Sequence, residues 1–398
     1  MTHFDVVVIG GGLVGCAAAY YLSKCGARVL LIESGDINGE ASGRNAGSLH
    51  FQLEYRLIKY GDDQAARFAQ IIPLSLAAIE DWIGLESELQ SHLEVRMSGG
   101  LIVGESSGDL RQLEIRQSLQ ERWGLQTSLL SASEVRRRAP YLADTITAAT
   151  FSEKEGYANP RLVTPAFARR AAVSGATIHG RTRAASLHRD GSGWRVRTIG
   201  PDAVPDDVTC GAVLNAAGAR AAEVAAMVHI HLPIFPVPLL MNVTERSEPL
   251  IPHLIQHASQ RLTVKQVAAG NILIGGGWPS RFPRTASSMD LQRRPELVVQ
   301  NIADNVTLAC DLIPALSSLH LLRCWQGTTG VTPDQMPLLG EVPEAPRFFV
   351  AAGEAAFTHG PTYARLISEL ILNGRPSLAI DLYSPARFSP INNFMAVV

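Results

Sequence analysis

The sequence, 398 residues long, is poor in the features that bind metals or nucleic acids. Its five cysteines, at positions 16, 25, 210, 310 and 324, include no Cys-x-x-Cys pair, so the usual spacing of zinc or iron–sulfur ligands is absent. The formal net charge is −2 and no basic run occurs, which argues against a surface for polyanions. We therefore expect no bound metal, no nucleic-acid partner, and cysteines that stay reduced, as in a cytoplasmic protein.

The chain also lacks a long uninterrupted apolar run near its start. The first apolar stretch is broken by glycines and by Lys24 and Arg28, unlike a signal peptide or a membrane span. The composition, 46% hydrophobic and 18% charged, is that of a globular protein, and 398 residues suffice for two domains or one large composite domain. We expect no membrane span.

Glycine is abundant at one point, directly after an aliphatic run. The segment FDVVVIGGGLVGCAAAYYL, residues 4–22, contains Gly10-x-Gly12-x-x-Gly15. The run before it predicts a buried parallel strand, and the small residues after it predict a helix that ends near Gly26. ARVLLIE then predicts a second buried strand, ending at Glu33. A strand, a glycine turn, a helix and a strand that ends in an acid form the dinucleotide-binding pattern.

Each residue type in this pattern has a physical task. Gly10 permits the tight turn, Gly12 lets backbone N–H groups approach a pyrophosphate, and Gly15 lets the helix pack closely on the strand. The helix N-terminus offers partial positive charge to the phosphates. Glu33 favours a ribose with a free 2′-hydroxyl, hence FAD or NAD over NADP. The cofactor-binding residues predicted here are Gly10, Gly12, Leu13, Val14, Gly15, Glu33 and Ser34.

A loop of small and polar residues follows the second strand. GDINGEASGRNAGSLH, residues 35–50, has too few apolar groups to build a core, so its amides and hydroxyls are free to surround phosphates and a ring. With Glu33, its stretch ASGRNAG resembles the FAD-binding loop of the D-amino-acid oxidase superfamily, in the branch of glycine oxidase, sarcosine oxidase and D-amino-acid dehydrogenase. The resemblance implies non-covalently bound FAD, contacted by Ser42, Arg44, Asn45, Ala46, Gly47 and Ser48.

Later segments carry the same resemblance. AVLNAAGARA, residues 212–221, is similar to the family's element beside the flavin, and residues 325–354, from WQGTTG to VAAGE, resemble its C-terminal signature. Residues 159–198 are similar to the adenine-side segment, and PTYARLISELILNG predicts a closing amphipathic helix. The further cofactor-binding residues implied are Ala184, Ala217, Gly218, Gly353, Thr358, His359 and Gly360.

The resemblance implies an α/β fold of two parts. One is a discontinuous FAD-binding Rossmann-like domain of the glutathione-reductase type, which we assign to residues 1–84, 146–225 and 321–398. The other is a smaller α+β substrate domain with an antiparallel sheet, assigned to residues 85–145 and 226–320.

The resemblance also implies the chemistry, which is oxidation of a C–N bond by hydride transfer to flavin, with hydrolysis of the imine by water. Simple amino-acid oxidases of this branch carry an Arg that pairs with the substrate carboxylate, and WQGTTG places Thr329 at that position. The anchor is then missing or moved, with Arg281, Arg284 and Arg323 as candidates. A secondary or N-substituted amino acid, such as an opine or hydroxyproline, therefore fits better than a plain D-amino acid.

The predicted catalytic residues are His50, Thr329 and His359. His359, in a shortened flavin-edge loop, is explained equally well by a flavin contact or by ordinary packing, and His50 is a candidate for the substrate side. Oxygen-using members of the sarcosine oxidase type have a Lys on a substrate-domain strand near the flavin. The comparable strand NILIGGG has none, which favours a dehydrogenase, although Lys265 could act from the neighbouring strand.

Three hypotheses remain open at this point. The leading one is the catalytic subunit of a multi-subunit dehydrogenase, similar to those for opines or hydroxyproline. Its electron-transfer partner subunits would also supply any FMN or iron–sulfur cluster. The alternative is an oxidase of D-amino acids or glycine that acts as a single chain. The third is a non-catalytic flavin-binding assembly subunit, since a shortened loop and a lost Arg are what decay of an active site produces.

Overall fold

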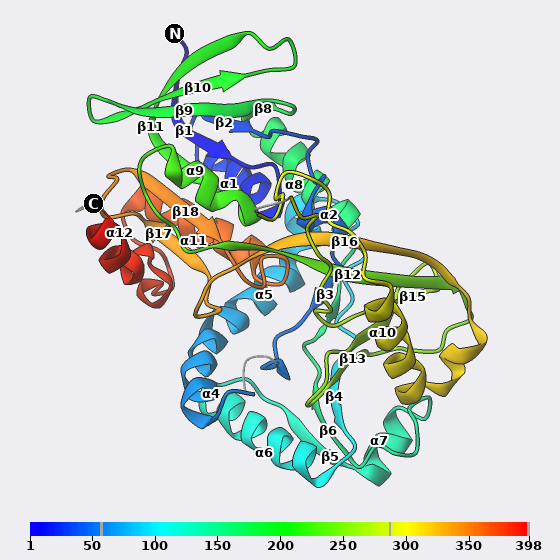
Figure 1. Cartoon of the computed structure of the whole chain (residues 1–398). Helices are drawn as coiled ribbons and strands as arrows, with labels where there is room; N and C mark the ends of the chain where they lie inside the picture. The colour runs from blue at the N-terminus through cyan, green and yellow to red at the C-terminus, as the bar shows by residue number, and fades with distance from the viewer. Residues whose placement is uncertain (56–58, 286–287, 396–398) are drawn as a thin grey trace.

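The computed structural model describes residues 1–55, 59–285 and 288–395. Two sheets of eight strands organise the chain, and Figure 1 shows one toward the top of the view and the other below it. The long strands β12 (Phe235–Arg246) and β16 (Leu321–Val331) lie side by side near the middle of the molecule. Segments far apart in sequence therefore pair at one edge of the second sheet.

The first sheet is built on the predicted N-terminal strand, with the order β17-β18-β11-β1-β2-β8. Strand β1 pairs in parallel with β11 and β2, and the parallel pairing continues to β8 on one side and β18 on the other. An antiparallel extension, β9 and β10, leaves from β11. The strands are β1 (His3–Ile9), β2 (Val29–Ile32), β8 (Thr177–His179), β9 (Arg183–Asp190), β10 (Gly193–Ile199), β11 (Pro205–Asn215), β17 (Leu338–Glu341) and β18 (Phe348–Ala352).

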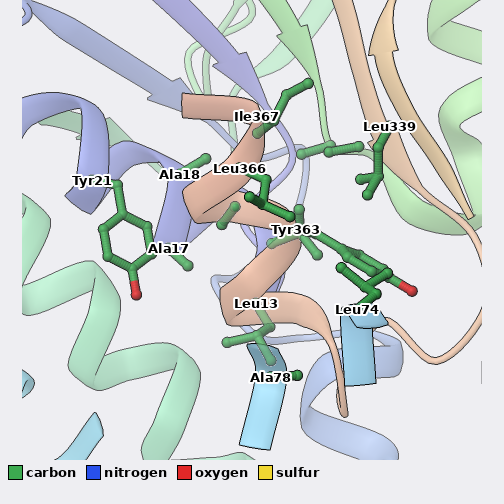
Figure 2. Packing of buried hydrophobic residues seen from close by; sticks show 14 of the residues in the cluster. Leu13, Ala17, Ala18, Tyr21, Leu74, Ala78, Leu339, Tyr363, Leu366 and Ile367 are labelled. Atoms are coloured by element: carbon green, nitrogen blue, oxygen red, sulfur yellow. The ribbon is translucent and has the colours of Figure 1, made fainter. Parts of the chain in front are cut away.

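Four helices form a core against this sheet. Figure 2 shows α1 side chains such as Leu13 and Ala17 beside Tyr363 and Leu366 of α11, with Leu74 of α5 next to them. The run of alanines in α1 is fully buried, and these small side chains let the helices approach closely. The four helices are α1 (Leu13–Lys24), α5 (Ile72–Leu89), α8 (Pro160–Val173) and α11 (Gly360–Asn373).

The second sheet has the order β16-β12-β15-β14-β13-β4-β6-β5, antiparallel except where β13 meets β4. A two-stranded sheet joins β3 (Ser48–Leu49) to β7 (Gly156–Tyr157). The strands of the large sheet are β4 (Gly100–Gly104), β5 (Ser128–Ser131), β6 (Ala148–Ser152), β12 (Phe235–Arg246), β13 (Leu254–His257), β14 (Thr263–Gln266), β15 (Asn271–Gly275) and β16 (Leu321–Val331). The remaining helical segments are α2 (Ala41–Arg44), α4 (Asp62–Phe68), η1 (Ala69–Ile71), α6 (Ser107–Arg122), α7 (Ala132–Arg138), η2 (Gly218–Arg220), α9 (Ala221–Ala226), α10 (Val299–Leu312), η3 (Pro314–Ser318), η4 (Asp381–Tyr383), η5 (Pro385–Phe388) and α12 (Ser389–Met395).

Two strands lie elsewhere than the predicted domain boundaries place them. Strands β6 and β16 belong to the second sheet, whereas the predicted boundaries put residues 146–225 and 321–398 in the FAD-binding part. The reason is pairing, because β6 hydrogen-bonds to β4 and β16 runs antiparallel to β12 along most of its length. The segments that resemble the family predict cofactor contacts, but they do not show which sheet a strand joins.

One helical stretch, residues 62–89, raises the question of a membrane. Among the described residues it alone is long and apolar enough, by composition, to cross a bilayer. However, 56% of its most apolar window is buried inside the protein, and Trp82 donates its Nε1–H to the carbonyl of Thr358, 2.6 Å away. Such burial is typical of a core helix.

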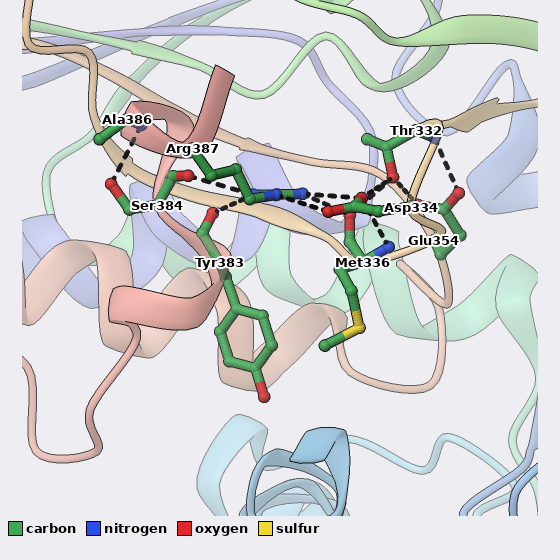
Figure 3. A network of polar contacts seen from close by, with 8 residues as sticks. All are labelled: Thr332, Asp334, Met336, Glu354, Tyr383, Ser384, Ala386 and Arg387. Carbon is green, nitrogen blue, oxygen red and sulfur yellow. Dashed lines mark hydrogen bonds and ion pairs between the residues drawn. The ribbon is translucent and has the colours of Figure 1, made fainter. Parts of the chain in front are cut away.

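The C-terminal segment is tied back to the loop after β16 by an ion pair. Figure 3 shows Arg387 beside Asp334, with 2.8 Å between Nε and Oδ2. Burial raises the pKa of Asp334, but the hydrogen bond and charge of Arg387 outweigh it and hold that pKa below its usual value. Thr332 links the loop to Glu354 through its N–H and hydroxyl. The turn at residues 332–334 therefore has a structural role.

Candidate active site

The glycine turn brings the end of β11 against the start of α1. Gly10 has a φ of +119°, and a Cβ there would lie 2.5 Å from the carbonyl oxygen of Ala216. A Cβ on Gly15 would lie 1.9 Å from the carbonyl oxygen of Gly10. Neither position leaves room for a side chain, so both glycines are required by the approach of backbone to backbone.

Gly12 differs from Gly10 and Gly15 because a side chain there would point toward the Ser42 side chain of the flavin loop and not into backbone. It is the N-cap of α1, and the one atom within 3 Å of a Cβ built there is the Ser42 hydroxyl oxygen, 2.9 Å away. The Leu13 N–H donates to that oxygen over 2.9 Å. The N–H groups of Val14 and Gly15 lie in the first helical turn, where the helix itself provides no acceptors. This open end, with its partial positive charge, fits a pyrophosphate.

Glu33 is held at the end of β2 by its carboxylate. Its two oxygens accept the N–H of Gly11 at 2.7 Å and the N–H of Gly35 at 2.6 Å, and the Ser34 hydroxyl also donates to it. The Thr182 N–H bonds to the Glu33 carbonyl over 2.7 Å. Ala184, buried in β9, therefore lies two residues beyond a contact with Glu33. The predicted ribose and adenine positions are adjacent.

The flavin loop is shaped by its own side chains. Asn45 donates to the carbonyls of Ala41 and Ser42 and accepts the N–H of Gly47. Gly47 has a φ of +74°, and a Cβ there would lie 2.0 Å from the carbonyl oxygen of Ala158. Ala46, half-buried, lies between these two fixed points. Asn45 therefore maintains the shape of the loop, and its own contact with FAD stays a prediction.

Strand β16 passes across this loop. Trp325 donates its Nε1–H to the carbonyl of Arg44 over 2.7 Å, and a Cβ on Gly327 would lie 3.2 Å from the Arg44 Cβ. The Arg44 guanidinium forms an ion pair with the exposed Glu40 at 3.3 Å. The flavin loop is thereby fixed to the second sheet.

Three polar side chains meet where the flavin loop ends. The Ser48 hydroxyl accepts a hydrogen bond from the Lys265 Nζ, 3.0 Å away, and the Thr358 hydroxyl donates to the Ser48 carbonyl. Lys265, on β14, is 1% exposed, and its Nζ lies 5.4 Å from the centre of the Tyr157 ring. Burial lowers the pKa of Lys265 well below its usual value. Two predicted FAD contacts, Ser48 and Thr358, therefore lie beside the buried amine of Lys265. The sequence analysis gives Lys265 only as an alternative to a Lys on the strand NILIGGG.

The other predicted cofactor residues converge on the same region. Ala217 donates its N–H to the Asn215 side chain, and Gly218, with a φ of +54°, begins η2. Gly353 follows β18 with a φ of +114°. A Cβ on Gly360, the first residue of α11, would lie 3.0 Å from a Leu13 methyl carbon. The helix N-termini of α1 and α11 are therefore neighbours.

His359 is a buried side chain held by packing. Its Nε2 is hydrogen-bonded to the Ser75 hydroxyl at 3.0 Å, and its ring stacks on Tyr363. Burial lowers its pKa to about 4, so the imidazole is neutral near pH 7. Among the described residues Nδ1 has no hydrogen-bond partner, which is compatible with the predicted flavin contact. The geometry favours this contact over proton transfer to a substrate.

Replacing His359 should remove a pH-dependent loss of stability. Its pKa is near 4 in the folded protein and near 6.5 when unfolded, so the unfolded chain binds the proton more readily. Its contribution is complete above about pH 6.5 and falls as the pH drops toward 4, by about 2 kcal/mol between pH 7.5 and pH 5. Urea midpoints across this range should vary less in His359→Gln than in the wild type. The exposed His231→Gln is the control, and an unchanged His359→Gln profile would contradict the assignment.

A cavity of about 270 Å³ lies between the second sheet and the segment after the flavin loop. Thr329 and Val331 of β16 line it, with Val237 and Leu239 of β12 beside them. On its other side the wall contains Gln256, His257, Arg261, Leu262 and Thr263, from β13, β14 and the turn between them. Thr329 therefore lines this cavity, and its role on the substrate side stays a prediction.

Other predicted substrate residues do not line this cavity. Neither His50, half-buried after β3, nor His359 is among its lining residues. The three candidate anchors are also elsewhere: Arg281 is exposed in an ion pair with Glu296, Arg284 lies beside Arg281 on a separate groove, and Arg323 is exposed at the start of β16. None of these three arginines is among the residues that line the cavity. The wall does contain two cations that no motif marks, Lys59 and Arg261.

Comparison with known proteins assigns the class. Residues 5–370 match the model of the FAD dependent oxidoreductase family, DAO, and the chain belongs to this family. It is 27% identical to glycine oxidase of Bacillus subtilis over 93% of this chain and 94% of that protein. It is 24% identical to sarcosine oxidase subunit beta of Rhodobacter capsulatus over 95% and 87%. The crystal structure of glycine oxidase from Geobacillus kaustophilus matches with a TM-score of 0.84 at 23% identity, over 97% and 99%.

These matches confirm the predicted family branch, the α/β fold class, the dependence on FAD and the oxidoreductase class. The roles of the individual residues stay predictions. What the geometry adds is that the glycine turn, the flavin loop and the start of α11 lie close to one another.

Proposed function

We propose that the chain oxidises the C–N bond of a secondary or N-substituted amino acid, such as an opine or hydroxyproline, to an imine that water hydrolyses. Bound FAD would supply the hydride acceptor. The observation that carries the proposal is Thr329 in the cavity wall, at the position where the resemblance places a carboxylate-binding Arg. The relative named sarcosine oxidase subunit beta supports a substituted amine, since sarcosine is N-methylglycine.

The protein's own residues would position the reactants. Glu33 would hold the adenosine ribose, and the open first turn of α1 after Gly12 would hold the pyrophosphate. Residues 42–48 and the start of α11 would surround the flavin end. The apolar side chains of Val237 and Leu239 would exclude water from the substrate, and this orientation of reactants is the main contribution a flavoenzyme protein makes.

Steady-state turnover with a dye acceptor tests the substrate class. We expect kcat/KM for an opine or hydroxyproline to exceed that for D-alanine by at least about tenfold, because no Arg at position 329 pairs with the carboxylate of a compact primary amino acid. D-alanine as the best substrate in the panel would contradict the proposal.

We further propose that the chain is the catalytic subunit of a multi-subunit dehydrogenase. Its sarcosine oxidase relative is named as a subunit, which supports partners that accept electrons and hold any FMN or iron–sulfur cluster. A cytoplasmic location is part of this proposal. The five cysteines, all within the described residues, are free thiols, which suits a reducing compartment.

The second candidate function is an oxidase that needs no partner subunit, and one observation favours it. The sequence prediction of a dehydrogenase used the absence of Lys from β15, but Lys265 on the adjacent β14 reaches Ser48 of the flavin loop. A cation at this point would stabilise negative charge as oxygen is reduced. Oxygen consumption by the isolated protein decides between the two candidates.

A further inference from the structure

A substrate of the proposed class has a carboxylate, and the cavity must contain a group that binds it. This requirement rests on the proposed function. Thr329 offers one hydroxyl, which cannot form the paired hydrogen bonds that a guanidinium gives to a carboxylate. The opposite wall, formed by β13, β14 and their connecting turn, has the donors that β16 lacks.

Gln256 supplies the first donor. It lies on β13, is 5% exposed and lines the cavity. Within the described part of the protein its Nε2 has no hydrogen-bond partner. A buried amide donor without an acceptor is unfavourable, and a carboxylate oxygen in the cavity would satisfy it.

Arg261 supplies the charge. It follows β13 in the turn to β14, and its Nη1 donates to the carbonyl of Gly277 over 3.2 Å. Gly277 lines the same cavity. One guanidinium nitrogen is therefore fixed at the wall, while its remaining N–H groups are available to an anion.

The turn that carries Arg261 is rigidly supported. Gly276 has a φ of +119°, and a Cβ there would lie 2.5 Å from the Leu262 nitrogen, so the two turns pack backbone to backbone. The Nδ1 of His257 accepts the N–H groups of Ser259 and Gln260 at 3.1 Å. This role requires a neutral imidazole, and burial lowers the pKa of His257 accordingly.

The sheet order separates this wall from Thr329. Strands β12 and β15 lie between β16 and β14, so the two walls are about 14 Å apart at the usual strand spacing. An anion held by Arg261 therefore cannot be the one that an Arg at position 329 would bind. We infer that Gln256 and Arg261 bind a carboxylate of the substrate, and that the substrate lies with this carboxylate toward the β13–β14 turn.

Pyrrole-2-carboxylate, a planar acid without an oxidisable C–N bond, tests the inference by calorimetry on the FAD-loaded protein. Its neutral analogue pyrrole-2-carboxamide measures binding without the charge. Arg261→Gln should weaken carboxylate binding by roughly 10- to 100-fold and change carboxamide binding by less than about threefold. Gln256→Leu should weaken carboxylate binding by about tenfold. Arg281→Gln, at an exposed residue that is paired with Glu296 and does not line the cavity, is the control and should bind as the wild type does.

The inference is overturned if Arg261→Gln, with full FAD content, binds the carboxylate as tightly as the wild type, or if the wild type does not prefer carboxylate to carboxamide. The outcome is independent of turnover. A carboxylate preference that disappears in Arg261→Gln, in a protein that no amino acid reduces, would support the anchor and refute the proposed function. Turnover by an Arg261→Gln protein with unchanged KM would do the opposite.

Discussion

Gly12→Val is expected to purify without FAD. The space beside the Gly12 Cα is bounded by the Ser42 hydroxyl, 2.9 Å from a Cβ built there, and the pyrophosphate would occupy this space at the start of α1. A branched side chain would fill it and push Ser42 away. We expect flavin content, measured from the absorbance ratio of the purified protein, to fall by more than about tenfold, since close approach of backbone to phosphate is lost.

The choice of Gly12 separates cofactor loss from unfolding. A Cβ on Gly15 would strike backbone at 1.9 Å, whereas at Gly12 it meets the movable end of a side chain. The variant should therefore fold with a wild-type circular dichroism spectrum. Gly84→Ala, in α5 where a Cβ meets nothing within 4 Å, is the control and should keep its flavin. Full flavin content in Gly12→Val would refute the assignment of the glycine turn.

Lys265→Met is expected to slow the reaction of the reduced protein with oxygen by roughly 10²- to 10³-fold. The buried Nζ is hydrogen-bonded to Ser48 at the end of the flavin loop. Negative charge that develops beside it favours the ammonium form, and an oriented cation in a buried site stabilises such charge strongly. Methionine has similar length and no charge.

Stopped-flow mixing of dithionite-reduced protein with oxygenated buffer measures this rate without a substrate. Lys154→Met, on an exposed side chain paired with Glu80, is the matched control. An unchanged rate in Lys265→Met would mean that Lys265 has a packing role only, and the partner-independent oxidase would lose the observation that favours it.

The cofactor side of the site could be predicted from sequence because its requirements are local. Gly10, Gly15 and Glu33 act through backbone conformation and contacts within one strand–helix–strand unit, and their spacing records this. Family-like segments extended the prediction to Thr358 and Ser48, which meet across the fold. A contact of this kind can be predicted only where both residues lie in segments that resemble the family.

The substrate side could not be predicted in the same way. Arg261 and Gln256 lie in an ordinary hairpin, and only the order of β13 and β14 in the second sheet brings them to a wall opposite Thr329. The sequence favours a dehydrogenase because β15, the strand comparable with the family's lysine-bearing strand, has no Lys. Lys265 lies on β14, which pairs with β15, and the sequence does not show this pairing. His359 is chemically suggestive, but whether its ring faces a cavity or Ser75 is decided by the packing of α5 on α11.

The most direct test of the central claim is an anaerobic visible spectrum of the purified protein, recorded alone and after addition of opines, prolines, N-methylglycine and D-amino acids. We expect a yellow protein whose oxidised flavin band bleaches with a secondary or N-substituted amino acid. Readmission of air then shows whether oxygen restores the band. A flavin band that none of these compounds reduces would contradict the account and leave a flavin-binding subunit whose chemistry lies elsewhere.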